Sequence, residues 1–174
     1  TFEFAGLYYT NRESDNINVD ASFVKTDISF LNAFEDPELY TDIEGELDGR
    51  LHIGGELNNP IVTGEMDIVH ARVKVPMFNV FFGAAGKLDF NDGEIIANHI
   101  SIIDQESNVA DCQMQIYHYD WADWNYNIML AMDNPVMTKK FLAMDTEYKE
   151  GDYYYGKAYV TGYVDVFGYD GHTE

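Results

Sequence analysis

Apolar and polar residues alternate one by one over much of this 174-residue chain, and this period of two constrains the fold more than any other feature. Successive side chains of a β-strand point to opposite faces, so strict alternation is typical of a half-buried strand. The clearest run has apolar residues or glycine on one side and acidic or basic residues on the other: Ile43, Gly45, Leu47, Gly49, Leu51 and Ile53 against Glu44, Glu46, Asp48, Arg50 and His52. We therefore predict a strand here with one apolar or bare face.

Similar runs recur at the spacing of a β-meander, and turn residues separate several of them. Asn91-Asp92-Gly93 predicts a hairpin turn, because Asp-Gly tolerates positive φ. The phase of the alternation changes at Ile68-Val69, which predicts a bulge. Near-helical spacing over 26–40 predicts one short helix that ends at Pro37. The other predicted strand regions are 16–23, 62–68, 69–75, 86–90, 96–102, 110–116, 126–132 and one long strand over 154–168. The expected fold is an all-β antiparallel meander that curls or folds over itself.

Length and charge limit the class of protein. A chain of 174 residues suits one domain, so we take 1–174 as a single β-domain. The net charge of −21 disfavours nucleic acid and anionic membrane surfaces as partners. Cys112 is the one cysteine, and its place in an apolar row predicts a small buried hydrophobe. No stretch has the length of a membrane span, and the start at Thr1 suggests a piece excised from a longer protein.

The sequence contains no nucleophile elbow, no phosphate-binding loop, no dinucleotide fingerprint and no His-Glu-x-x-His motif. The histidines are dispersed, and His118 with Asp120 forms a close pair of a histidine and a carboxylate. A pair without a third ligand favours turn polarity over a metal site. We therefore expect no enzyme, no metal and no cofactor. An acidic glycoside hydrolase is a remaining alternative, because carboxylate separations cannot be measured in a sequence.

Aromatic residues support a second alternative, a secreted carbohydrate-binding β-sandwich. Trp121, Trp124 and the run Tyr153-Tyr154-Tyr155 could stack on sugar rings. Such residues more often fill a core or cap the edge of a sheet.

The apolar face has two interpretations: the core of an ordinary sandwich, or an open groove. Small residues in the last strand, together with the adaptable side chains of Met66, Met114 and Met132, favour the roomier interior. The residues predicted to line a lipid or apolar groove are Leu47, Leu51, Ile53, Val62, Met66, Ile68, Val73, Val75, Leu88, Phe90, Ile100, Ile102, Cys112, Met114, Ile116, Ile128, Leu130, Met132, Val160, Val164 and Val166.

The order of several short segments resembles the C-terminal domain of the TamB family, the translocation and assembly module proteins related to AsmA, most closely in its Bacteroidetes members. The similarity covers 45–168. Its segments are Gly49-Arg50-Leu51-His52-Ile53-Gly54-Gly55, Asn59-Pro60-Ile61-Val62-Thr63-Gly64, Ala71-Arg72-Val73-Lys74-Val75-Pro76, Gly86-Lys87-Leu88-Asp89-Phe90, Ile102-Ile103-Asp104, Ile116-Tyr117-His118, Tyr154-Tyr155-Gly156-Lys157-Ala158 and Gly162-Tyr163-Val164-Asp165-Val166-Phe167-Gly168.

This resemblance implies a U-shaped sheet, the β-taco, with an apolar groove. It implies a periplasmic protein that transfers phospholipid between the inner and outer membranes, assists outer-membrane protein assembly, or does both. The implied partners are phospholipid acyl chains or nascent outer-membrane β-strands, together with an Omp85-type outer-membrane protein similar to TamA. The inner-membrane anchor that the family carries is not in this chain, and residues 1–44 match less clearly.

Overall fold

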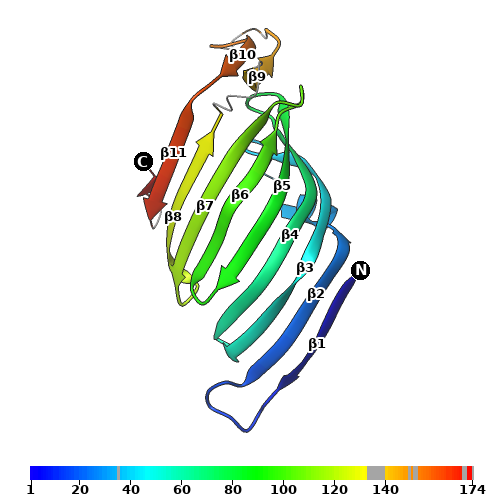
Figure 1. The fold of residues 1–174 in the computed structure, drawn as a ribbon, viewed down its shortest axis with the longest axis vertical. Coiled ribbons are helices and arrows are strands. Elements are labelled where there is room, and N and C mark those ends of the chain that lie inside the picture. The colour runs from blue at the N-terminus through cyan, green and yellow to red at the C-terminus, as the bar shows by residue number, and fades with distance from the viewer. Residues whose placement is uncertain (35, 133–139, 149, 151–152, 170–171, 174) are drawn as a thin grey trace.

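The computed structural model describes the whole chain except residues 35, 133–139, 149, 151–152, 170–171 and 174. Its main element is one antiparallel sheet, in which neighbouring strands follow each other in the order β1-β2-β3-β4-β5-β6-β7-β8-β11-β12. The sheet is open, and the N- and C-terminal strands form its opposite edges (Figure 1). The strands of this sheet are β1 (Phe2–Tyr8), β2 (Ile17–Asp27), β3 (Thr41–Glu56), β4 (Asn59–Val75), β5 (Val80–Asn91), β6 (Glu94–Ile103), β7 (Val109–Tyr119), β8 (Ala122–Ala131), β11 (Tyr163–Tyr169) and β12 (His172–Thr173).

A second, small sheet joins β9 (Phe141–Thr146) to β10 (Gly156–Val160). The predicted long strand over 154–168 is therefore wrong. Strand β10 ends at Val160, and the next strand, β11, belongs to the main sheet. Gly162 lies in this break with φ of 112°, a conformation that favours glycine. The predicted helix is confirmed only as a short 3₁₀ segment, η1 (Ser29–Phe34).

The predicted phase change at Ile68-Val69 is confirmed as a β-bulge. Leu47 pairs with Ile68 and Glu46 pairs with His70, so Val69 is the extra residue of β4. A second bulge lies in β6, where Ala97 pairs with Met114 but Ile100 pairs with Cys112. Each bulge inserts one residue, and the alternation on both sides of it then keeps the same apolar face.

The hairpin predicted at Asn91-Asp92-Gly93 is also confirmed. Asn91 pairs with Glu94, which leaves Asp92 and Gly93 as the two-residue turn, and Gly93 has φ of 69°. Gly54 and Gly55, by contrast, do not interrupt the chain, because β3 continues through both to Glu56.

The sheet bends sharply between β4 and β8. Trp121, in the turn between β7 and β8, donates its indole N–H to the carbonyl of Pro60 at the start of β4 over 2.5 Å. In the same place Asn59 donates to the carboxylate of Asp120 over 2.7 Å. Strands β4 and β7 are three spacings apart in the sheet, roughly 14 Å if it were flat. The turn therefore reaches across the β5–β6 hairpin, which it can do only because the sheet curves.

Strand β9 packs against β5 at the other end of the sheet. Phe141 stacks on Phe82 of β5 with ring centroids 5.7 Å apart, and Leu142 and Val80 are completely buried beside them. The β9–β10 hairpin lies beyond the ends of β5 and β6 in Figure 1. Both ends of the curved sheet thus carry contacts between segments that are not neighbours in it.

Candidate functional site

The apolar face of the main sheet is continuous across its strands, because the register brings the apolar positions of each strand opposite those of the next. One row crosses seven strands, from β3 to β11: Leu47, Ile68, Gly86, Ile100, Cys112, Leu130 and Val164. A parallel row holds Ala97, Met114, Ile128 and Val166. A third holds Leu51, Gly64, Phe90, Ile95, Ile116, Tyr126 and Gly168. We call these rows the inner face.

Most of the predicted groove residues fall on this face. Ile53 lies opposite Val62, Met66 opposite Leu88, and Ile102 between Ala84 and Ala110. Val73 and Val75 pair with Phe82 and Val80 near the end that β9 covers. Met132 follows β8, and its N–H donates to the carbonyl of Gly162.

Val160 is the one predicted groove residue that the structure places in a different sheet. It pairs with Phe141 in the β9–β10 hairpin, so it is not part of a row of the main sheet. The break at Gly162 is the physical reason, since β10 leaves the main sheet there. Ile96 lies opposite Asp89 and Gln115, away from the face of Ile100, because the bulge in β6 shifts the alternation.

The inner face is only half-buried. Of the predicted groove residues, Ile100 is buried, Val164 is 48% exposed, and all the others are intermediate. Among the residues that the structure describes, the buried hydrophobic ones are Ala21, Ile28, Val80, Ala97, Ile100, Ala110, Phe141 and Leu142. The interior of a two-layer sandwich would bury its long side chains almost completely. The long side chains of the inner face therefore keep access to solvent.

Cys112 lies between Ile100 and Leu130 in the row that runs from Leu47 to Val164. Burial raises the pKa of its thiol, and the nearby carboxylate of Asp111 raises it further. The raised pKa favours the neutral thiol, which is a small apolar group, although Cys112 is half-buried and not buried as predicted.

Trp121 and Trp124, considered above for sugar stacking, pack around one histidine. The ring of His118 lies 4.2 Å from that of Trp121 and 4.9 Å from that of Trp124. The Nδ1 atom of His118 accepts the backbone N–H of Trp121, while the carboxylate of Asp120 accepts from Asn59. This aromatic cluster stabilises the bend of the sheet, and it leaves Trp124 37% exposed.

The opposite, outer face is polar and carries the other histidine–carboxylate pairs. His52 lies 2.9 Å from Asp20 and His99 lies 3.1 Å from Asp111, both on exposed strand positions. No group of three metal-ligating side chains occurs in the described part of the chain. The side chain of His172 lies outside the described residues.

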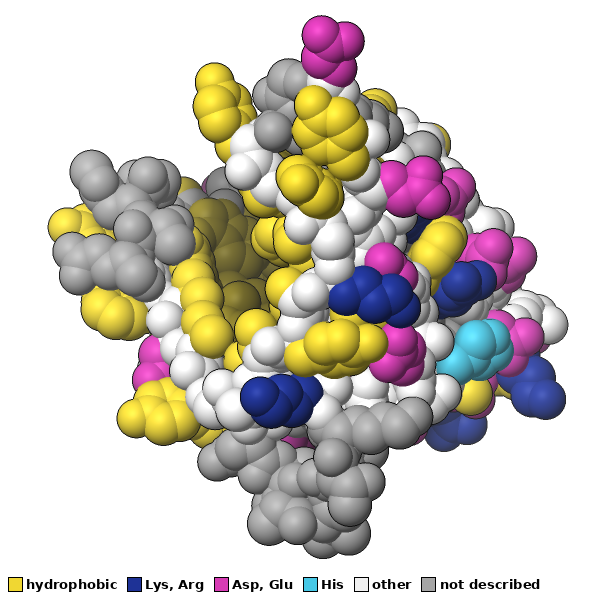
Figure 2. All heavy atoms as spheres, turned by 90° about the horizontal axis from the view of Figure 1, so that it is seen from above, with side chains coloured by type: hydrophobic (Ala, Val, Ile, Leu, Met, Phe, Trp, Pro, Cys, Tyr) yellow, Lys and Arg dark blue, Asp and Glu magenta, His cyan; other side chains and the backbone are white. Residues whose placement is uncertain are grey.

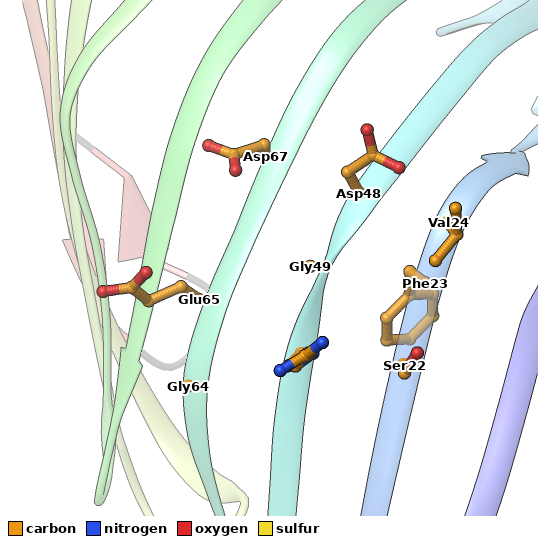
Figure 3. Close-up of a pocket in the computed structure, with 9 residues that line it drawn as sticks. Ser22, Phe23, Val24, Asp48, Gly49, Gly64, Glu65 and Asp67 are labelled. Atoms are coloured by element: carbon orange, nitrogen blue, oxygen red, sulfur yellow. The ribbon is translucent and has the colours of Figure 1, made fainter.

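A shallow recess of about 520 Å³ lies on β2, β3 and β4 (Figure 3). Asp48 on β3 and Glu65 and Asp67 on β4 line it, together with Ser22 on β2. Lys87 bonds to Glu65 over 2.8 Å and this hydrogen bond, above all, raises the pKa of the lysine. Arg50, Phe23 and Val24 line the recess too, and three carboxylates against one guanidinium leave it net negative, which disfavours anions.

Sequence reasoning missed a buried network that holds β9 against the main sheet. Asp104 is 3% exposed, and its carboxylate accepts hydrogen bonds from the backbone N–H groups of Glu106, Asn108 and Leu142 and from the side chain of Asn108. Asp followed four residues later by Asn was the local signal of a tight loop. Its bond to Leu142, 38 residues away, had no signal in the sequence.

A charged cluster next to this network fixes β10. Lys157 contacts Glu106 over 3.1 Å and Asp145 over 3.2 Å. The hydrogen bond to Glu106, followed by that to Asp145, raises the pKa of Lys157 to about 12. Glu106 has its pKa lowered, chiefly by Lys157, and accepts the hydroxyl of Tyr159 as well. These groups join the β6–β7 loop to the β9–β10 hairpin, and none of them belongs to a row of the inner face.

Comparisons with protein-family models, with curated proteins and with solved structures found no match. Within the described residues, no helix is long and apolar enough to cross a membrane.

Proposed function

We propose that this chain is a non-enzymatic periplasmic segment whose inner face shelters the acyl chains of phospholipids during transfer between the inner and outer membranes. Assistance to outer-membrane protein assembly, with an Omp85-type partner, is the related role that the sequence resemblance implies. The observation that carries the proposal is the inner face itself, a set of apolar rows that crosses the sheet while its long side chains stay half-buried.

The shape of the molecule supports an open groove of U-shaped section. Figure 2 looks from the β9–β10 end and shows a hollow whose visible walls are hydrophobic side chains. The hydrogen bonds from Trp121 to Pro60 and from Asn59 to Asp120 bring β4 and the β7–β8 turn together. A sheet bent in this way has a concave side, and the rows of apolar residues fit that side.

The dimensions and energetics suit an acyl chain. Strands β3 to β7 each have ten or more residues, so at about 3.3 Å per residue they extend at least roughly 33 Å. The hydrocarbon part of one bilayer leaflet is only about 15 Å deep. Each methylene removed from water contributes about 0.8 kcal/mol, so a lipid is held without any specific headgroup site. Weak and distributed contacts of this kind permit sliding along the groove.

The alternative is a carbohydrate-binding module that would stack sugars on Trp121 and Trp124. Both tryptophans make contacts within the protein. The indole N–H of Trp121 is bonded to Pro60, and Trp124 packs on His118. Tyr153, Tyr154 and Tyr155 stay exposed, so the proposal takes lipid as the ligand class because of the inner face and not because aromatic residues are missing from the surface.

A photocrosslinking experiment tests the proposal. A photoreactive amino acid replaces Met114 or Leu130, which lie on the inner face, and the protein is incubated with vesicles containing radiolabelled phosphatidylethanolamine. The matched controls replace Gln113 and Met129, which lie opposite each other on the outer face. We expect labelled lipid on the inner positions only. Equal labelling of the inner and outer positions, or none at either, would contradict a lipid groove.

A further inference from the structure

The turn between β7 and β8 joins two parts of the bent sheet that are not neighbours in it. Its two central residues are Asp120 and Trp121, because Tyr119 pairs with Ala122. The indole N–H of Trp121 donates to the carbonyl of Pro60 on β4, three strands away from β7 in the sheet. We call residues 119–122 the strap, since they hold β7 and β4 together across the β5–β6 hairpin.

The backbone of the strap has a conformation that tryptophan does not favour. Asp120 has φ of 51° and Trp121 has φ of 57°. Two successive residues with positive φ are typical of a type I′ turn, in which Asn-Gly is a preferred pair. Aspartate tolerates this region, but positive φ is unusual at a residue as bulky as tryptophan. Contacts around Trp121 are therefore needed to hold the turn in this conformation.

His118 supplies one of these contacts. Its Nδ1 atom accepts the backbone N–H of Trp121 over 3.2 Å, and its ring packs on the rings of Trp121 and Trp124. An imidazole nitrogen accepts a hydrogen bond only when it carries no proton, and both nitrogens of the imidazolium are donors. Protonation of His118 at Nδ1 therefore sets N–H against N–H and removes a contact that holds the strained turn.

His118 and Trp124 lie on the concave side of the sheet. They follow Ile116 and Tyr126, which face each other in a row of the inner face, at a distance of two residues along β7 and β8. The strap thus crosses one end of the inner face, and its state sets how far β4 and β7 stand apart there.

The charged groups next to His118 are acidic and come from several elements. No lysine or arginine is among the described residues that line the recess beside it. Glu94, next to the β5–β6 turn, is bonded to Tyr117. The carboxylates that line the recess lie before β2, at the end of β3, in the β5–β6 turn and in the strap: Asp15, Glu56, Asp92 and Asp120. A protonated ring that leaves Trp121 therefore has acceptors within the same recess.

We propose that the strap is a pH-sensitive device: neutral His118 keeps it closed on Pro60, and protonation of His118 releases it. The closed state binds one proton fewer than the open state, so falling pH favours opening. Histidine side chains ordinarily change charge between about pH 5 and 8. Opening would widen one end of the inner face for the acyl chains of the proposed function. The strap itself rests only on contacts within the chain, so its test needs no lipid and can fail while the proposed function stands.

A distance measurement between two spin labels tests the strap. The labels are attached at Leu57→Cys in the β3–β4 turn and Ala122→Cys in the strap, both exposed positions, with Cys112→Ala to remove the native thiol. Double electron–electron resonance measures the distance at about pH 7.5 and about pH 5.5. We expect a second population at the lower pH that is longer by roughly 5 Å, the spacing of one strand. It should grow at least about fivefold, the effect of losing one hydrogen bond.

Three variants of the labelled protein assign the response to the strap. His118→Asn offers a side-chain oxygen as acceptor and does not titrate, so its distances should not change with pH. Trp121→Phe removes the indole N–H and should show the longer distance at both pH values. His99→Asn, on the outer face beside Asp111, should respond as the protein with native His99 does.

The proposal would be overturned by distances that do not change with pH, or by an equal response in His118→Asn. A shorter distance at low pH would also contradict it, because the imidazolium would then bind the tryptophan rings more tightly and hold the strap closed. Circular dichroism follows the sheet over the same pH range. Loss of the sheet signal together with the change in distance would equally overturn the proposal, since the opening would then be part of general unfolding.

Discussion

Asp104 illustrates how one buried side chain can join segments that are distant in the sequence. Its two carboxylate oxygens accept four N–H groups at 2.6 to 2.9 Å, three from its own loop and one from Leu142. Hydrogen bonds to a charged acceptor are stronger than those between neutral groups, and a buried donor without a partner costs its full desolvation energy. The carboxylate therefore stabilises both the β6–β7 loop and the docking of β9.

We expect Asp104→Asn to lower the free energy of unfolding by about 2–4 kcal/mol, because the new amide places a donor against N–H groups that need an acceptor. Chemical denaturation measures the loss. The control is Asp165→Asn on β11, where the carboxylate is exposed and the change should be within about 0.5 kcal/mol. Equal effects of the two substitutions would show that Asp104 has no special role.

At the scale of strands, the glycines of the sheet mark places where two backbones approach too closely for a side chain. A Cβ on Gly64 would lie 2.2 Å from the carbonyl oxygen of Arg50 on β3, and the φ of Gly64 is 132°. Gly49, diagonally across on β3, would similarly place a Cβ 2.4 Å from the carbonyl of Glu65. Glycine inside a strand often permits such an approach and a strong local twist or bend. These positions let β3 and β4 pair closely over their great length.

Gly64→Ala should therefore lower the free energy of unfolding by at least about 2 kcal/mol, through the backbone clash and the unfavourable φ. The matched control is Gly54→Ala in β3, where a Cβ would meet only the ring of His52, at 3.3 Å. That ring is on a side chain that can move, so the control should cost less than about 1 kcal/mol. Thermal and urea unfolding of both variants measure the difference. A Gly64→Ala protein as stable as the control would contradict the close approach.

At the scale of the whole molecule, negative charge opposes the compact state. The chain carries 31 acidic residues against 10 basic ones, and some carboxylates face each other directly, as Asp48 and Asp67 do across β3 and β4. Like charges at opposed positions of neighbouring strands are destabilising. With few fully buried side chains to offset this repulsion, the stability of the protein should depend on ionic strength.

Raising NaCl from about 10 mM to about 500 mM should raise the thermal midpoint by roughly 3–8 °C, since salt shortens the range of repulsion between surface charges. Differential scanning calorimetry at pH 7 measures the shift. The double variant Asp48→Asn/Asp67→Asn should be more stable at low salt and gain less from added salt. A midpoint that falls with salt in the native protein would contradict the repulsion.

Much of the secondary structure could be predicted from local pattern. The strands over 16–23, 43–53, 62–75, 86–90 and 110–116, the bulge at Ile68-Val69 and the turn at Asp92-Gly93 all follow from alternation and turn chemistry. Phe2, Phe4 and Tyr8 alternate too, but Ala5, Gly6 and Leu7 between them blurred the pattern, so β1 was not predicted. The break at Gly162 was missed because the alternation runs through it without a change of phase.

The sequence alone determined that this protein is all-β and that its strands carry an apolar face, because alternation is a property of each strand by itself. Only the tertiary structure decided that β11 pairs with β8 while β9 and β10 leave the sheet, and that Val160 leaves with them. The same holds for the bonds from Trp121 to Pro60 and from Asp104 to Leu142, which join residues 61 and 38 positions apart. Such contacts depend on how far the sheet bends and which ends it brings together, and no local pattern of residues encodes that distance.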